Sequence, residues 1–223
     1  MHHYILFLYA CVKHQNKSFG SVLSLLYNGG TLTLNNTGRN LFLQGATAAN
    51  GGIVNMVSGS NLTLNGNTLF SLLAGSNFSG SAGTLRVLAG ETLDVTVAQT
   101  FPAAMVLSLE NGVINNAQSL TVQGGFDITG GTVNGTGTFT TPSTNTTTYI
   151  GSTNLSIGAG LSWLNQGTFN YNSSFSDLVV NGPNFTNDTL GIMNFNQTSN
   201  SAEVIGTGQL INLNLGAMNI NAT

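Results

Sequence analysis

The chain has 223 residues, enough for one or two ordinary domains or for a single elongated one. Only 5% of its residues are charged and the formal net charge is −3, which excludes the basic surface that nucleic acids and anionic lipids require. Cys11 is the only cysteine, so an intrachain disulfide and a thiolate metal cage are also excluded.

Residues 1–27 differ in character from the rest of the chain. The apolar run YILFLYACV at 4–12 has the length of a signal-peptide core, but His2 and His3 stand where lysine or arginine is expected. Nine apolar residues are too few for a membrane-spanning helix, which needs about 20. Three interpretations stay open for this atypical segment: an export signal, a cap over the end of the core, and the truncated start of a longer gene.

From residue 28 onward, one short phrase recurs: a glycine followed by alternating polar and apolar residues. The residues two positions after these glycines are all apolar, and they are Leu32, Val54, Leu85, Ile114, Phe139, Phe169, Met193 and Met218. Successive copies lie 22 to 31 residues apart, a spacing typical of solenoids. The alternation predicts strands with one face in a core, and the equal phrases predict that these eight side chains form a single inward file.

Further alternating phrases lie between the copies of the first. Examples are NLTLNG at 61, SLTVQG at 119 and DLVVNG at 177. We therefore predict a coil of two or three short strands, with residues 28–223 forming a single-stranded parallel β-helix, or β-solenoid, of about seven to eight coils. Stacked coils repeat each position at short distance, which disfavours charges and favours asparagine and threonine ladders.

The alternative fold is a set of antiparallel hairpins in a sandwich or barrel. The stretch YNGGTLTL at 27–34 fits a hairpin with Asn28 and Gly29 at its tip. A sandwich, however, offers no reason for one phrase to recur eight times at similar spacing.

The runs GTGTFTTPSTN, NQGTFNYNSS and NGPNFTNDTLGIMNFN resemble the strand repeats of bacterial secreted adhesins, namely autotransporter passenger domains and filamentous-haemagglutinin-like exoproteins. The resemblance covers about residues 28–223. It implies a right-handed parallel β-helix, export to the bacterial cell surface, and attachment to host cells, matrix, glycans or neighbouring bacteria. The chain shows no evident outer-membrane barrel or secretion domain, so it is interpreted as a fragment of a larger repeat array.

Catalytic groups are sparse in the repeat region. All three histidines, His2, His3 and His14, lie in the atypical segment, which leaves no Ser-His-Asp arrangement within the repeats. Paired carboxylates serve polysaccharide-cleaving enzymes, and Asp94, Asp127 and Asp177 lie in or next to predicted strands. Asp94 follows the leucine of its phrase and Asp177 precedes it, so we expect them to point to opposite sides.

Other signals have a structural and a functional interpretation. GGFDITGG at 124–131 resembles a calcium-binding nonapeptide, but Asp127 stands alone. Trp163 and Tyr171 would suit sugar stacking, although Tyr171 falls in an inward position. An ice-binding face would need threonine triplets such as TLT at 31 and TFT at 138 in register on most coils, and the sequence does not have them.

The sequon N-x-S/T occurs twelve times, for instance at Asn61, Asn77, Asn154, Asn172 and Asn184. Glycosylation is one reason for such a motif. A strand with polar residues at alternate positions produces the same motif without glycans, and this is the interpretation we favour.

These observations favour a non-enzymatic, secreted or surface-exposed β-solenoid that serves as a stalk or adhesin. The alternatives are a polysaccharide-active lyase or glycosidase on the same fold, and a repeat fragment without separate activity. No catalytic, cofactor-binding or metal-binding residue is predicted. The partners we expect are host-cell or matrix glycans and proteins, and neighbouring coils or further copies of the chain that cover open strand edges.

Overall fold

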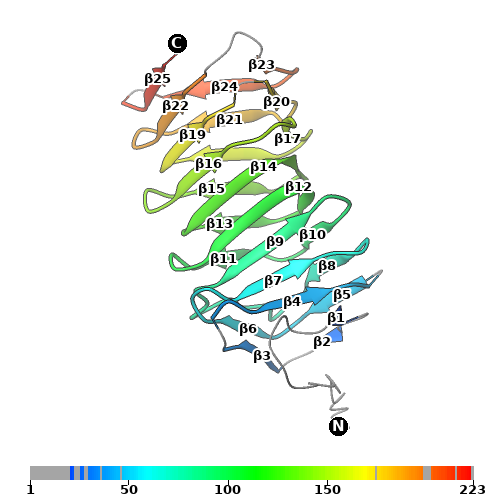
Figure 1. Ribbon diagram of the computed structural model, residues 1–223. Coiled ribbons are helices and arrows are strands. Elements are labelled where there is room, and N and C mark those ends of the chain that lie inside the picture. The colour runs from blue at the N-terminus through cyan, green and yellow to red at the C-terminus, as the bar shows by residue number, and fades with distance from the viewer. Residues whose placement is uncertain are drawn as a thin grey trace.

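The computed structural model describes residues 21–22, 26–27, 30–35, 37–45, 47–173, 175–197, 202–213 and 215–221. In this part of the chain the secondary structure is all strand and turn, and the strand pairings are parallel throughout. The strands stack in about eight turns along one axis, from the N-terminal end at the bottom of Figure 1 to the C-terminal end at the top. The predicted β-solenoid is confirmed, and the antiparallel alternative is wrong.

Each turn of the solenoid passes along face A, then face B, then face C. The strands of face A are β1 (Ser21–Val22), β4 (Asn40–Leu43), β7 (Asn61–Leu64), β9 (Thr84–Leu88), the first half of β12 (Val106–Asn116), the first half of β14 (Gly125–Asn134), β16 (Thr146–Tyr149), β19 (Thr168–Tyr171), β22 (Ile192–Phe195) and β25 (Ala217–Ile220). The long strands β12 and β14 run on from face A into face B.

Faces B and C complete the turn. The other strands of face B are β2 (Leu26–Tyr27), β5 (Thr47–Asn50), β8 (Leu69–Leu72), β10 (Thr92–Val95), β17 (Leu155–Ile157), β20 (Leu178–Val180) and β23 (Val204–Ile205). Face C is a six-stranded sheet of β11 (Gln99–Phe101), β13 (Ser119–Val122), β15 (Thr138–Thr141), β18 (Ser162–Asn165), β21 (Asn184–Asn187) and β24 (Gln209–Asn212). At the same point of the earlier turns, β3 (Thr31–Leu34) pairs with β6 (Ile53–Met56) in a separate two-stranded sheet.

The atypical segment predicted at residues 1–27 is described only for β1 and β2. Both strands pair in parallel with strands of the next turn, β4 and β5. The apolar run at 4–12, Cys11 and the three histidines lie outside the described residues.

The predicted single file of eight apolar side chains is wrong, because the eight residues are distributed over all three sides of the solenoid. Leu85, Phe169, Met193 and Met218 lie on face A, Ile114 on face B and Phe139 on face C, while Leu32 pairs with Val54 in the two-stranded sheet. Strands on all three faces show the same alternation of apolar and polar residues, so aligning the repeated phrases does not identify the face on which a strand lies. The inward orientation itself is correct, since six of the eight are fully or almost fully buried and Leu32 and Met218 are partly buried against the same core.

The true inward files run one residue per turn along each face. On face A the file passes through Leu41, Leu62, Leu85, Leu107, Phe126, Thr147, Phe169, Met193 and Met218. On face C it passes through Gln99, Leu120, Phe139, Trp163, Phe185 and Leu210. Because each coil buries its inward residues against the coils on either side, the core is continuous along the axis.

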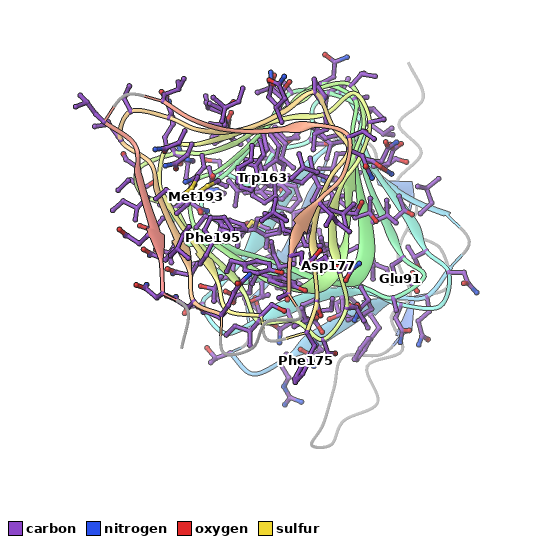
Figure 2. All side chains as sticks on the ribbon, turned by 90° about the horizontal axis from the view of Figure 1, so that it is seen from above. Glu91, Trp163, Phe175, Asp177, Met193 and Phe195 are labelled. Atoms are coloured by element: carbon purple, nitrogen blue, oxygen red, sulfur yellow. The ribbon has the colours of Figure 1, made fainter. Side chains whose placement is uncertain are left out.

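Large aromatic side chains fill the middle of this core. The ring centroid of Trp163 lies 4.8 Å from that of Phe185 and 4.7 Å from that of Phe139. Seen along the axis, Trp163, Met193 and Phe195 lie inside the ring of strands (Figure 2). Truncation of such a buried aromatic costs about 3 to 5 kcal/mol, so this cluster is a main source of stability.

A ladder of amides, buried at Asn165 and Asn187, follows the end of the face C strands. The Nδ2 of Asn165 donates to the Oδ1 of Asn187 at 2.8 Å, and the Nδ2 of Asn187 donates to the Oδ1 of Asn212 at 2.7 Å. The hydroxyl of Thr141 extends the ladder by donating to Asn165 at 3.0 Å. Each asparagine also donates to a backbone carbonyl in the turn that follows it, at Gly167, Gly191 and Gly216 respectively. The ladder therefore fixes the corner between faces C and A, as the parallel stacking of asparagines predicts.

Candidate binding face

Since the inward residues form the core, candidate functional residues are the outward ones. Along each strand the outward residues are those between the buried positions, and they form files parallel to the solenoid axis. The turns between strands form the three edges. The three faces differ in the chemistry of their outward files.

The aspartates singled out from the sequence do not meet. Asp94 is an outward residue of face B, where its carboxylate accepts hydrogen bonds from the Nδ2 of Asn115 at 2.8 Å and from the hydroxyl of Ser71 at 3.3 Å. Asp177 directly precedes β20 of the same face and accepts from the backbone N–H of Glu203 at 3.0 Å. The strands β10 and β20 are separated by β12, β14 and β17, so the two carboxylates lie at least about 19 Å apart at 4.8 Å per step along the axis.

The expected opposite orientation of Asp94 and Asp177 is wrong, because both side chains point outward. Leu93 and Leu178 are fully buried, whereas both aspartates are only partly buried. In a strand the residues before and after an inward leucine lie on the same, outward side. Whether an aspartate comes before or after the inward leucine therefore does not decide if its side chain points inward or outward.

Asp127 lies alone on face A, in register with Ser108 and Thr148. Partial burial raises the pKa of its carboxyl. The neighbours in its file carry hydroxyls and no second carboxylate, and the carboxylate of Glu110, on the neighbouring strand β12, is held by Arg86 rather than free to pair with Asp127 for acid and base chemistry. Asp127 also lacks the further acidic ligands that a calcium site requires.

The charged pair on face A is structural. The guanidinium of Arg86 donates two hydrogen bonds to the carboxylate of Glu110, each 2.7 Å long. These bonds from Arg86 lower the pKa of Glu110. The pair joins β9 to the bend of β12, and both charges are therefore already engaged within the protein.

Glu91 is a buried carboxylate that the sequence patterns did not single out. It is 2% exposed, and it accepts hydrogen bonds from the backbone N–H groups of Asn67, at 2.9 Å, and of Thr68. It thus satisfies two donors in the turn of the coil beneath it. A lone glutamate between a glycine and a strand is the signal that would have pointed to such a role.

Trp163 and Tyr171 are buried too deeply to contact a ligand. Trp163 is 1% exposed and Tyr171 is fully buried, with its hydroxyl donating to the backbone carbonyl of Ser176. Burial raises the pKa of that hydroxyl. The inward assignment of Tyr171 is confirmed, and the sugar-stacking interpretation of both residues is wrong.

The sequons follow the strand pattern. Asn187 and Asn145 are fully or almost fully buried, and their amides donate to neighbouring coils. Asn172 and Asn196 are joined by a 2.7 Å hydrogen bond on the outer side of face A. These four motifs thus serve coil stacking, which agrees with the structural interpretation of the repeated sequon.

Face A also carries an outer amide ladder near the C-terminal end. The Nδ2 of Asn194 donates to the Oδ1 of Asn170 at 2.8 Å, and the Nδ2 of Asn219 donates to the Oδ1 of Asn194 at 2.7 Å. Each amide is therefore committed to its neighbours. This arrangement stiffens face A. Only part of the hydrogen-bonding capacity of these amides remains for a ligand.

Face C differs because hydroxyl side chains dominate two neighbouring outward files, whereas outward hydroxyls of faces A and B, such as Thr148 and Ser156, stand among carboxylate, amide or apolar side chains. Its central outward file consists of Thr100, Thr121, Thr140, Leu164, Thr186 and Ile211, and the file beside it of Ser119, Thr138, Ser162, Asn184 and Gln209. In the described part of the chain, none of the hydroxyls in these two files makes a side-chain hydrogen bond. These two files also contain no charged residue.

The geometry of face C is that of a lattice set by the parallel register of its strands. Neighbouring coils repeat each position at about 4.8 Å, with hydroxyls in unbroken series from Thr100 to Thr140 and from Ser119 to Ser162, and alternate residues on one strand lie about 6.6 Å apart. Hydroxyl pairs stand side by side on the adjacent strands β13 and β15, as Ser119 with Thr121 and Thr138 with Thr140. A hydroxyl both donates and accepts, so the lattice can bind another neutral, hydroxyl-rich surface. The triplet TFT at 138 is visible in the sequence, but only the register of β11 to β24 shows the file that it belongs to.

Neither a metal centre nor a membrane-spanning helix is present in the described ranges. No group of three or more histidine, cysteine, aspartate or glutamate side chains there is arranged to hold a metal ion. No helix there is sufficiently long and hydrophobic to traverse a bilayer. Comparison with family models, with curated proteins and with solved structures finds no significant match, so function is inferred from the geometry and the sequence.

Proposed function

We propose that the protein is a non-enzymatic β-solenoid of a cell surface or secreted assembly, which acts as a rigid stalk or adhesin and binds neutral glycans through face C. The observation that carries the proposal is the lattice of uncommitted hydroxyls on face C. The resemblance of the repeats to bacterial secreted adhesins supports the surface location.

The charge distribution supports a neutral ligand. The charges of Arg86 and Glu110 neutralise each other on face A, and Asp94 lies on face B. Face C offers donors and acceptors without charge, so binding depends on hydrogen bonds and contact with threonine methyl groups. Such binding changes little with salt, unlike binding through ion pairs.

The regular spacing supports a polymer rather than a small molecule. A single exposed hydroxyl contributes little to affinity, since a typical net hydrogen bond is worth about 0.5 to 1.5 kcal/mol. A repeating ligand engages many equivalent hydroxyls at once, and the later contacts are then intramolecular. Extended glycans and matrix polymers have this repeating character.

The test compares two matched threonine pairs. Replacing Thr121 and Thr140 with glutamate puts two charges on adjacent strands in the middle of face C, whereas Thr146→Glu with Thr168→Glu puts the same charges on adjacent strands at outward positions of face A. Binding of the purified chain to a panel of neutral and acidic polysaccharides and to cell surfaces is measured for both. We expect the face C variant to lose at least about tenfold in affinity, and the face A variant to bind as the unmodified chain does.

Two results would overturn the proposal: no binding to any member of the panel, or equal loss for both variants. The same panel tests the enzymatic alternative predicted from the sequence. Release of reducing ends that disappears in Asp127→Asn would replace the adhesin proposal with a polysaccharide-active enzyme.

A further inference from the structure

The hydroxyl series of face C begins and ends at definite coils. The sheet of face C starts at β11, and in the preceding turn only Asn77 pairs on this side among the described residues, through an isolated bridge to β6. Threonine occupies the central outward file on β11, β13 and β15, and Leu164 takes the next position, on β18. The central hydroxyls therefore span three coils.

The neighbouring file continues the series by one coil. Ser119, Thr138 and Ser162 follow one another on β13, β15 and β18, and an amide, that of Asn184, takes the next position on β21. Ser119 and Thr138 are exposed, and Ser162 is half-buried. The two files together offer hydroxyls on four consecutive coils of face C, which stack along the axis (Figure 1).

This arrangement favours a ligand that runs along the axis rather than along the strands. Along the axis each file presents one position per coil at about 4.8 Å, without interruption by a turn. Along β15 only Thr138 and Thr140 present outward hydroxyls, about 6.6 Å apart, before the strand ends at the buried Thr141. A straight polymer across the strands would leave the hydroxyls after one or two of its units, whereas a polymer along the axis can contact all four coils.

The repeat of the files fits one class of neutral polymer. An extended β-1,4-linked pyranose chain advances per sugar by a length close to the spacing of adjacent coils. Chains with α-1,4 linkages curve into helices, so their successive sugars cannot all meet a straight file. An extended polypeptide repeats at about 6.6 Å for alternate residues, which does not match the coil spacing.

The chemistry of the two files suits such a pyranose chain. Each hydroxyl both donates and accepts a hydrogen bond, as the hydroxyls of a sugar do. Each threonine adds a methyl group that can pack against the C–H groups of a sugar ring. The two files carry no charge, so an uncharged ligand leaves no charged group desolvated without a partner.

On the basis of the neutral glycan binding proposed above, we propose that face C selects extended β-1,4-linked polysaccharides and holds them parallel to the solenoid axis. Each sugar faces one coil, so the bound segment is about four sugars long. The polysaccharide extends beyond the four coils at both ends, and a long chain therefore binds at any point along its length.

Calorimetric titration of the purified full chain with two matched oligosaccharide series tests the proposal. The series are β-1,4-linked gluco-oligosaccharides and α-1,4-linked malto-oligosaccharides of two to six sugars. For the β-linked series we expect the affinity to rise about two- to tenfold with each added sugar up to four, because each sugar adds a hydrogen-bonded contact, and then to level off. The α-linked series should show no such rise.

The loss of one hydroxyl locates the site. Thr140→Val keeps the β-branched shape and removes a central hydroxyl of face C, and Thr148→Val makes the same change at an outward position of face A. Because both side chains point outward, neither change opens a cavity in the core. We expect Thr140→Val to weaken binding of the β-linked tetrasaccharide about two- to tenfold, and Thr148→Val to leave it unchanged.

The outcomes separate this inference from the proposed function. An affinity that levels off at two sugars, an α-linked series that binds as well as the β-linked one, or binding to long polysaccharides alone would each overturn the inference, while glycan binding by face C would stand. An equal effect of both valine variants would overturn the placement on face C. A chain that binds no neutral oligosaccharide or polysaccharide would overturn the proposed function and this inference with it.

Discussion

At the scale of single residues, asparagine performs two different tasks in this protein. Asn165 and Asn187 are fully buried and hold adjacent coils together through their side-chain amides. Asn170 and Asn194 do the same on the outer side of face A, where water competes for each hydrogen bond. The same residue type in the same kind of ladder therefore differs in its contribution to stability.

Asn187→Ala should lower the free energy of unfolding by about 1 to 3 kcal/mol, because it removes the buried hydrogen bonds that Asn187 makes with the Asn165 amide and with the carbonyls of Gly191 and Ala217. Urea denaturation followed by circular dichroism measures the change. Asn194→Ala is the matched control, and it should change stability by no more than about 0.5 kcal/mol. Equal costs for both would show that burial does not decide the strength of the ladder.

At the scale of strands and turns, close approach between coils explains many of the glycines. Gly137 precedes β15, and its backbone N–H donates to the carbonyl of Asn116 in the coil beneath at 2.9 Å. A Cβ atom at this position would lie 1.6 Å from the carbonyl oxygen of Gln118. Glycine is therefore required here by the distance between stacked backbones rather than by a left-handed conformation.

Gly137→Ala should destabilise the protein by at least about 1 to 3 kcal/mol, since two backbones must move apart. Gly125→Ala is the control within β14, where the added Cβ would make an ordinary contact of 3.4 Å with Val106. It should leave stability unchanged or raise it by about 0.4 to 1 kcal/mol through the unfolded state. Thermal unfolding of both variants checks this difference, and a Gly137→Ala chain as stable as the unmodified one would contradict the close approach of the two coils.

At the scale of the whole molecule, stability is a sum of contacts between neighbouring coils. A central coil such as that of β14 and β15 has a partner on both sides, whereas the coil of β24 and β25 has one among the described strands. Local opening should therefore be easiest at the C-terminal end.

Hydrogen exchange of the unmodified chain should show this gradient. We expect amides of β14 and β15 to exchange slowest, and amides of β24 and β25 at least about tenfold faster. Uniform protection along the axis would instead indicate that the solenoid unfolds as a single unit.

Fold class and the direction of most side chains could be predicted from the amino-acid order. Alternation of apolar and polar residues identifies inward positions such as Leu93 and Tyr171 without reference to their neighbours, because a strand has a period of two. Scarcity of charge and abundance of asparagine and threonine likewise indicated stacked coils. The prolines at 102, 142 and 183 lie between strands, as expected.

The face that each strand occupies, and hence which outward residues are neighbours, follows from the stacking of the coils in three dimensions. The turns differ in length, with two residues between β18 and β19 but four between β21 and β22, so counting along the chain loses the register. The threonines of face C come from strands about two dozen residues apart, and parallel pairing alone makes them adjacent.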